Sequence, residues 1–376
     1  MPWKEVSIMS SRKEFVFLAR QEGANIRALC RQFGISPKTG YKLLARFAEE
    51  GEEGLADRSR QPKASPLRTA AAMEAALLAL RDRHPAWGAR KLRKRLQDTG
   101  MEGVPCPSTI TAILRRHGRL DPAESAKHKA WHRFEHDAPN DLWQMDFKGH
   151  VAMREGRCHP LTVLDDHSRY AVCIRACPDE QTATVRDALA DTFRRHGLPW
   201  RMTMDNGPPW GDTLGSPYTP LTVWLLRLGI AVSHSRPYHP QTQGKDERFH
   251  RTLKAELLGL ETFADLACAQ QRLDAWRDLY NLERPHQALG LQVPVSRYRP
   301  SQRAFPESLP DIEYGPDDIV RKVQCQGELN YRGRVWQVSK AFHGYPVAIR
   351  PTAQDGVMEV FFCQHRIASI SLNEPQ

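Results

Sequence analysis

The sequence lacks the features of membrane, secreted and zinc-ribbon proteins. No apolar run among its 376 residues approaches membrane-spanning length, and residues 1–17 lack the apolar core of a secretory signal. The eight cysteines are scattered and form no C-x-x-C pair, which argues against a zinc ribbon or a disulfide framework and for reduced thiols. We therefore expect a cytoplasmic protein with no membrane partner.

A nucleotide-binding P-loop and an even distribution of charge are also missing. No G-x-x-x-x-G-K-[ST] motif occurs, so any ATPase helper would be a separate protein. Residues 1–137 hold 26 Lys and Arg against 16 Asp and Glu, whereas the remainder holds 28 of each. The whole excess of +10 thus lies in the N-terminal third. This suits a polyanion-binding part tethered to another activity, although a merely soluble basic protein is the alternative.

A helix-turn-helix pattern occupies residues 11–47. Apolar residues recur at helical spacing from Ile26 to Phe33, Gly34 makes one sharp break, and Ser36 can cap a second helix over 37–47. A helix, a short turn and a capped second helix are typical of DNA-binding modules. The polar face predicted to contact DNA comprises Lys38, Thr39 and Lys42, beside Ser36, and the basic tether that follows adds Arg58 and Arg60.

A second unit of three helices is predicted over residues 67–120. The helices span 69–84, 89–97 and 108–117, with Ser108 as the cap of the third. Ile110, Ile113 and Leu114 should pack inward, while Thr109, Thr111, Arg115 and Arg116 remain polar. The predicted DNA contacts here are Lys91, Arg115 and Arg116. A plain helical bundle is the alternative for each of the two units.

Three acidic residues stand in distinct settings further along the chain. Asp146 lies mid-strand in LWQMDFKG, Asp205 ends a short strand at the Asn206-Gly207 turn, and Glu247 lies in the first turn of a helix. Carboxylates in such positions can converge, and they repel one another unless cations lie between them. Hard oxygen ligands of this kind suit Mg²⁺ or Mn²⁺.

The surrounding pattern predicts a mixed sheet with helices on both faces. Leu142, Gln144, Asp146 and Lys148 should share one strand face, and Trp143, Met145 and Phe147 the other. Asp146 and Asp205 should then lie on adjacent central strands. The predicted strands are 142–148, 161–166, 170–176, 201–205 and 231–235, and the helices are 182–196, 219–228, 245–258 and 263–281.

Four ordered blocks resemble the catalytic core of retroviral integrases and, more closely, of bacterial insertion-sequence transposases. The blocks are the strand of Asp146, LTVLDDHSRYAV (161–172), PYHPQTQGKDE (237–247) and YNLERPHQALG (280–290). The resemblance covers roughly residues 134–300, and PAWGARKLRKRL with PSTITAILRRHG extends it to the second helix-turn-helix unit. It departs from integrases in lacking their histidine–cysteine zinc module. The 41 residues between Asp205 and Glu247 are also more than is usual, with the extra length around PPWGDTLGSPYTP.

The resemblance implies a DDE enzyme with a ribonuclease-H-like core. Asp146, Asp205 and Glu247 would be the catalytic residues and the metal ligands, holding two Mg²⁺ or Mn²⁺ ions per active site, about 4 Å apart. Water would first hydrolyse the transposon end, and the freed 3′-OH would then attack target DNA. The protein would be nucleoid-associated.

Further residues are predicted to contact DNA near this site. Glu247, Arg251 and Lys254 are spaced i, i+4, i+7 and share a helix face, where the two cations could follow a phosphate backbone. The alternative is an ordinary surface salt bridge contributing about 0.3–0.5 kcal/mol. Lys148, His239 and Gln241 complete the predicted set.

A different composition marks the C-terminal tail. After a Pro-rich stretch, residues 318–372 show short β patterns with turn signals at Gly327, Gly333, Gly344 and Gly356. Five strands of this size suggest a small SH3-like barrel, similar to the C-terminal β domains of transposases and integrases. It would help in DNA binding and assembly, or be a passive cap on the core.

These predictions define a multidomain α+β chain. The domains are helix-turn-helix domain I (1–62), helix-turn-helix domain II (63–120), a basic linker (121–139), the ribonuclease-H-like integrase core (140–293), a Pro-rich linker (294–316) and the small β-barrel (317–376). The expected function is metal-dependent transposition on double-stranded DNA, binding terminal inverted repeats and target. We expect a homodimer or tetramer on paired ends, with some catalysis in trans. The alternatives are a transposase-derived DNA-binding regulator with the core as dimerisation platform, and a plain ribonuclease-H-type nuclease.

Overall fold

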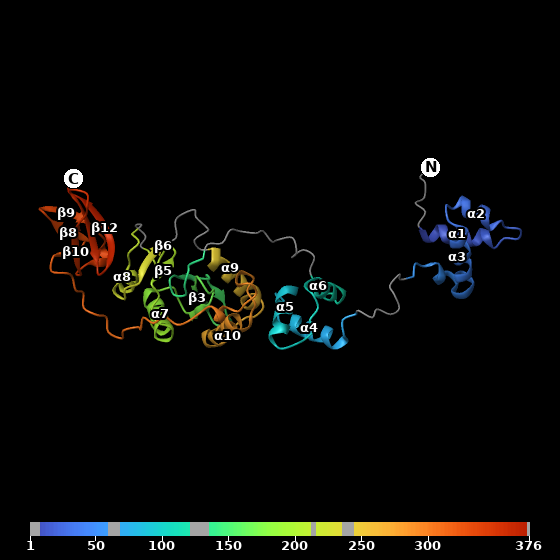
Figure 1. Cartoon of the computed structure of the whole chain (residues 1–376), viewed down its shortest axis with the longest axis horizontal. Helices are drawn as coiled ribbons and strands as arrows, with labels where there is room; N and C mark the ends of the chain where they lie inside the picture. Colours follow the sequence, from blue (N-terminus) through green and yellow to red (C-terminus); the bar gives the residue numbers. More distant parts are fainter. Residues whose placement is uncertain (1–7, 59–67, 121–134, 212–215, 235–243, 374–376) are drawn as a thin grey trace. The chain divides into compact units, whose positions relative to one another are not determined.

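The computed structural model describes residues 8–58, 68–120, 135–211, 216–234 and 244–373. It divides into two compact units, residues 1–68 and 69–376 (Figure 1). Within the described ranges, no helix has both the length and the apolar character needed to cross a membrane.

The N-terminal unit is a small three-helix domain. Its helices are α1 (Ile8–Ala19), α2 (Ile26–Gln32) and α3 (Pro37–Glu50), followed by the 3₁₀ turn η1 (Gly51–Leu55). They enclose a core of Phe15, Val16, Cys30, Leu43 and Leu55. This arrangement confirms the predicted helix-turn-helix.

Capping side chains decide where these helices begin. The Ser36 hydroxyl accepts a hydrogen bond from the Thr39 backbone N–H (3.1 Å), as predicted. The prediction of a single break, at Gly34, was wrong. A second break precedes Asn25, whose side-chain oxygen caps α2 by accepting from the Ala28 N–H (3.0 Å).

The second helical domain begins the larger unit. It contains α4 (Ala71–Arg83), α5 (Ala89–Asp98) and α6 (Pro107–Arg116) around Leu77, Trp87 and Leu92. Ile110, Ile113 and Leu114 of α6 are buried, as their spacing predicted. The predicted capping role of Ser108 was wrong, because Pro107 is already helical and Cys106 is the N-cap.

The central domain contains a six-stranded mixed sheet. Its strand order is β4-β3-β1-β5-β6, and short β2 also pairs with β3. β1 is antiparallel to β3 and parallel to β5, so the predicted adjacency of the two aspartate-bearing strands is confirmed. The strands are β1 (Trp143–Phe147), β2 (Val151–Ala152), β3 (Arg157–Asp165), β4 (Ala171–Cys177), β5 (Arg201–Met204) and β6 (Ala231–His234).

Helices cover both faces of this sheet (Figure 1). α7 (Thr182–His196) and α8 (Pro220–Arg227) enclose one core cluster with Trp143 and Met145. α9 (Gly244–Leu253) and α10 (Leu266–Asp278) enclose the other, with Leu164 and Ile174. The alternation along β1 thus separates its apolar side chains from the face that carries Gln144 and Asp146.

Two of the predicted long helices end in π-helical turns. α9 continues as η3 (Lys254–Leu258) and α10 as η4 (Leu279–Glu283). A buried ion pair from Arg284 Nε to Glu256 Oε1 (2.9 Å) joins the two turns. Such turns are rare and are often found at functional sites. Short 3₁₀ turns, η5 (Gln287–Leu289) and η6 (Pro294–Ser296), lead out of the core.

The C-terminal domain is built from small antiparallel sheets. A four-stranded sheet of order β12-β11-β10-β7 and the hairpin β8-β9 share one core with Val223 and Leu226 of α8. The predicted small β domain is confirmed, with six strands in place of five. They are β7 (Ile319–Lys322), β8 (Glu328–Tyr331), β9 (Arg334–Gln337), β10 (Pro346–Pro351), β11 (Val357–Phe362) and β12 (His365–Ser371), with η7 (Lys340–Phe342) between β9 and β10.

Candidate active site

Asp146 and Asp205 lie at the same end of two neighbouring parallel strands. In the β1–β5 register Gln144 pairs with Thr203, and each aspartate follows two residues later. Carboxyl ends of adjacent parallel strands meet at one edge of a sheet, which is where ligands bind in many α/β folds. Among the predicted acidic residues, these two are therefore brought together by the sheet itself.

The surroundings of Asp146 oppose its negative charge. Burial raises the pKa of Asp146 to about 6, and the charges of Asp205 and Glu180 add to the rise. Its side chain remains 29% accessible, so a ligand can reach it. A divalent cation would reverse this penalty, because opposite charge favours the ionised carboxyl.

A buried histidine supports the strand of Asp146. The Thr162 hydroxyl donates to the Asp146 backbone O (3.0 Å) and lies 2.7 Å from His250 Nε2. Burial, with the charge of Lys148, lowers the pKa of His250 to about 4, so the imidazole is neutral at pH 7. The 3.8 Å approach of His250 Nδ1 to Asp146 Oδ2 is therefore a contact of a neutral ring and not an ion pair.

The face of α9 that packs on the sheet carries Asp246 and His250. Both side chains are buried, whereas Glu247, one residue further, is exposed. Burial raises the pKa of Asp246 well above its ordinary value, and the charges of Asp146 and Asp166 add to it. Neither Asp246 carboxyl oxygen has a hydrogen-bond partner among the described residues. Asp246 and His250 were not among the predicted site residues, although their i, i+4 spacing on one helix face was a usable signal.

Of the three predicted carboxylates, Asp146 and Asp205 lie at neighbouring strand ends, whereas Glu247 is exposed on α9. Across the described ranges, no three His, Cys, Asp or Glu side chains lie close enough together to hold a metal ion. Glu247 faces solvent with Arg251 and Lys254, which are also exposed. The metal role of Glu247 stays a prediction.

The additional length between Asp205 and Glu247 is anchored on the core. Trp210 is buried and its ring stacks on Phe147 with centroids 5.6 Å apart. The Asp205 backbone O lies 2.9 Å from His234 Nδ1, which ties the strand end to β6. The predicted DNA contacts His239 and Gln241 fall outside the described residues.

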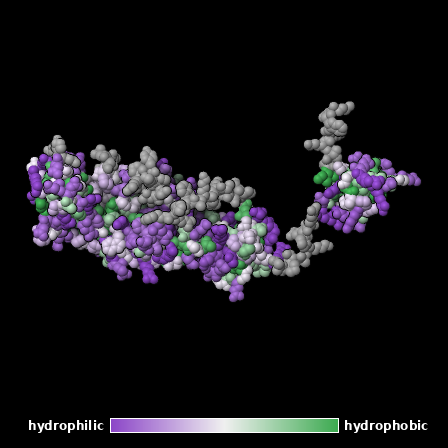
Figure 2. Space-filling view, turned by 45° about the horizontal axis from the view of Figure 1, so that its top comes forward, coloured by the Kyte–Doolittle hydropathy of each residue, from purple (hydrophilic) through white to green (hydrophobic). Residues whose placement is uncertain are grey.

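Basic residues predicted to contact DNA in the N-terminal unit are displayed at its surface. Lys38 and Lys42 on α3 are exposed, and Thr39 is half-buried beside the capping Ser36. Arg58 forms an ion pair with Glu50, and Arg60 falls outside the described residues. The surface of this unit is mostly hydrophilic in Figure 2.

The basic residues of the second helical domain differ in exposure and in ion pairing. Arg115 is exposed, whereas Arg116 pairs with the largely buried Glu74 (2.6 Å). Burial, with the charge of Arg284, lowers the pKa of Lys91 to about 8. Lys91 is half-buried, as is Lys148 near Asp146.

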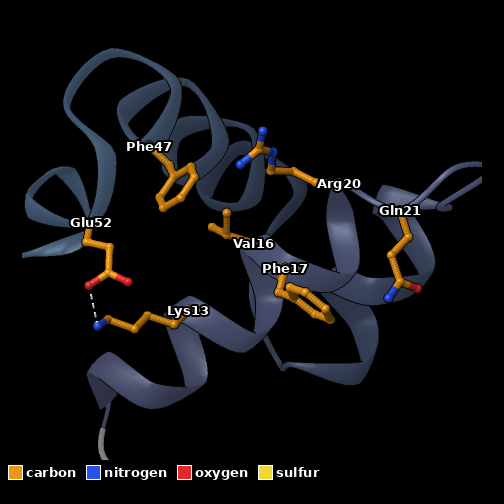
Figure 3. A pocket seen from close by; sticks show the side chains of 7 residues that line it. All are labelled: Lys13, Val16, Phe17, Arg20, Gln21, Phe47 and Glu52. Carbon is orange, nitrogen blue, oxygen red and sulfur yellow. Dashed lines mark hydrogen bonds and ion pairs between the residues drawn. The ribbon is translucent and has the colours of Figure 1, made fainter.

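A hollow of about 450 Å³ lies on α1, beside Phe47 of α3 (Figure 3). Phe17, which is 69% exposed, lines it, and the ion pair of Lys13 with Glu52 closes one side. Lys38, Thr39 and Lys42 do not line it, so it is a separate surface feature.

Comparison with known families agrees with this domain order. Residues 11–63 match a helix-turn-helix domain and residues 39–114 a homeodomain-like domain. Two integrase core domain families match, over residues 136–240 and 228–294. Residues 318–376 match the C-terminal domain of IS481 family transposases.

Two of the similar proteins come from insertion elements. The chain is 30% identical over 167 residues to a 31.7 kDa protein of insertion element IS407 from Burkholderia multivorans, covering 44% of this chain and 58% of that protein. It is 29% identical over 165 residues to a 39.2 kDa protein of IS476 from Xanthomonas euvesicatoria, covering 44% and 46%. The chain thus spans about half the length of these relatives.

A solved structure of the BIV integrase catalytic core domain is 23% identical and covers 42% of this chain and 92% of that one. Its TM-score of 0.32 is too low to support an argument. The family matches, with the insertion-element relatives, confirm the predicted resemblance. The chain is therefore similar to insertion-sequence transposases, and its matched regions run from helix-turn-helix domains through an integrase core domain to the C-terminal domain of IS481 family transposases.

Proposed function

We propose that this protein is a DNA transposase that binds the terminal inverted repeats of its element and catalyses divalent-metal-dependent 3′-end hydrolysis and strand transfer. The observation that carries the proposal is the β1–β5 register, with Asp146 and Asp205 at neighbouring strand ends. An integrase core domain around them and helix-turn-helix domains before them support it.

In this proposal Asp146, Asp205 and Glu247 hold two Mg²⁺ or Mn²⁺ ions. The donor set fits, because burial and the charge of Asp205 raise the pKa of Asp146, and a cation relieves that repulsion. When bound, the ions would supply positive charge to the attacking and leaving oxygens of the phosphodiester. Because three carboxylates repel one another without cations, we expect Glu247 to join the two aspartates only when the ions bind.

Other residues of the chain would orient the reacting groups. Thr162 and His250 keep the strand of Asp146 in place through the bonds described above. Lys148, Arg251 and Lys254 would contact phosphates near the scissile bond, together with His239 and Gln241, which precede α9 in the sequence. No protein nucleophile is needed, since water and then the DNA 3′-OH attack phosphorus.

DNA recognition is assigned to the helix-turn-helix domains. Lys38, Thr39 and Lys42, with Arg115 and Arg116 of the second domain, would contact the element ends, and Arg58, Arg60 and Lys91 would add to binding. Two ends must be joined to one target, so we propose a homodimer or tetramer on paired ends, with part of the catalysis in trans.

Strand transfer with the purified chain and the inverted repeats that flank its gene tests the proposal. Labelled end DNA should become joined to a target plasmid in Mg²⁺ or Mn²⁺, and chelation should stop the reaction. Specific end binding without cleavage or joining in either metal would refute the enzyme and favour a transposase-derived DNA-binding regulator.

A further inference from the structure

The carboxylate of Asp166 contacts both β1, which carries Asp146, and α9, which carries Glu247. Asp166, which follows β3, is only 2% exposed. Its Oδ1 accepts a hydrogen bond from Gln144 Nε2 (2.7 Å) and an ion pair from Lys245 Nζ. Its Oδ2 accepts from the His136 backbone N–H (2.9 Å). These bonds join Asp166 to residues 136–144 and to Lys245, which are far apart in sequence.

Each side-chain partner of Asp166 lies two residues before one of these two triad members in the sequence. Gln144 lies on β1 two residues before Asp146, on the same face of the strand. Lys245 lies in the first turn of α9, two residues before Glu247. Asp166 therefore connects the strand of Asp146 to the helix of Glu247, near the predicted reaction centre on both sides.

Burial makes this connection stiff. The Lys245 side chain is 18% exposed and that of Asp166 is 2% exposed, so water competes little for the ion pair. Lys245 also lies 3.4 Å from the Asp166 backbone O, a second bond to the same residue. Removing either partner would leave a largely buried charge without its counter-ion and would loosen the first turn of α9.

We propose that Asp166 is a positioning residue that, through Gln144 and Lys245, sets the distance between Asp146 and Glu247 and so determines the affinity of the site for divalent cations. This inference rests on the proposed function, because it assumes that Glu247 joins Asp146 in holding the ions. Asp166 itself touches neither the ions nor DNA in this assignment.

The neighbouring residue provides a matched control. Asp165 is equally buried, at 0% exposure, and also accepts several hydrogen bonds. Its carboxylate accepts hydrogen bonds from the Ser168 N–H (2.8 Å), the Ser168 hydroxyl (2.5 Å) and the Asn140 N–H (2.7 Å). None of these residues belongs to α9, so Asp165→Asn perturbs the same turn without breaking the link to Glu247.

The experiment measures Mn²⁺ binding to the full-length chain by electron paramagnetic resonance of the free ion, together with the Mn²⁺ dependence of strand transfer. Asp166→Asn and Lys245→Met should each weaken Mn²⁺ binding about 10–100-fold, the usual effect of losing a partner behind a metal ligand. The double variant should be no weaker than the worse single one, because both remove one interaction. Lys245→Arg, which keeps the charge, should bind Mn²⁺ within a few-fold of wild type.

Thermal unfolding shows which variants are folded at the assay temperature. If Asp166→Asn does not fold, Lys245→Met still tests the inference, because Lys245 is the less buried partner. Unchanged Mn²⁺ affinity in a folded Asp166→Asn or Lys245→Met variant overturns the inference. An equal loss in Asp165→Asn overturns it too, since the effect would then be general to the turn. If wild type joins DNA while these variants bind Mn²⁺ normally, only this inference fails. If wild type neither binds Mn²⁺ nor joins DNA, the proposed function fails with it.

Discussion

The N-terminal helix-turn-helix unit and the integrase core use charge in opposite ways. In the former, cations such as Lys38 and Lys42 lie exposed at the surface. In the latter, carboxylates such as Asp146 and Asp246 are drawn into the protein, where burial raises their pKa. Exposed cations suit a polyanion that arrives with its own counter-ions. Carboxylates that oppose their own ionisation suit a cation that the site must attract.

This contrast predicts that chemistry and DNA binding can be separated, and the largest effect should come from Asp146→Asn. Loss of a ligand charge should reduce the rate of strand transfer at least a hundredfold. This exceeds the loss of about 10–100-fold that is usual when an outer partner of a metal ligand is removed. End binding in a gel-shift titration should remain within a few-fold of wild type. Residual joining above a few per cent would remove Asp146 from the site.

The converse substitution acts on the exposed cations. Lys38→Ala with Lys42→Ala should lower the slope of log affinity against log salt by about 2, since each phosphate contact contributes about 0.9. Mn²⁺ binding by the core should not change. Lys13→Ala is the control, because Lys13 lies on α1 and pairs with Glu52 of η1. An equal change of slope in the control would show that α3 does not face DNA.

Stability should also separate the two regions. A side chain at Gly40 would place Cβ 2.5 Å from Cys30 Sγ and 2.9 Å from Phe15 Cζ. Gly40→Ala should therefore destabilise the N-terminal unit by about 1–3 kcal/mol. This cost exceeds the free energy gained from the higher helix propensity of Ala. Calorimetry of the intact chain should show a lower melting temperature for that unit and an unchanged core transition. Gly88→Ala, where the Cβ meets nothing within 4 Å, should leave both transitions nearly in place.

The smallest effect concerns an ordinary ion pair outside both regions. Arg350 lowers the pKa of Asp318 to about 2 through a bidentate contact (2.7 and 2.8 Å). The stabilisation is complete above the ordinary carboxyl pKa and is lost as the pH falls through about 2. Asp318→Asn should thus lower the melting temperature of the C-terminal domain slightly at pH 7 and flatten its decline below pH 4. Asp317→Asn, at the exposed neighbouring position, should keep the wild-type profile, and identical profiles for both would contradict the prediction.

Periodicity and capping chemistry predicted much of the fold. The helix predicted over 182–196 has those bounds in the structure, and the Ser36 cap and the inward side chains of α6 were also correct. These features depend on residues within one or two turns of each other. The Ser108 cap was wrong because Pro107 and Ser108 compete to begin the same helix, and the fixed φ of proline favours its place at the first helical position.

By itself, the sequence determined the order of the domains, the uneven charge and the strands that carry Asp146 and Asp205, because these follow from composition and local pattern. Only the tertiary structure decided that Asp246 and His250, and not Glu247, face the sheet from α9. It alone placed Asp166 between Gln144 and Lys245, 22 and 79 residues away along the chain. The physical reason is that helix rotation and long-range hydrogen bonds are set by packing between elements that lie far apart in sequence.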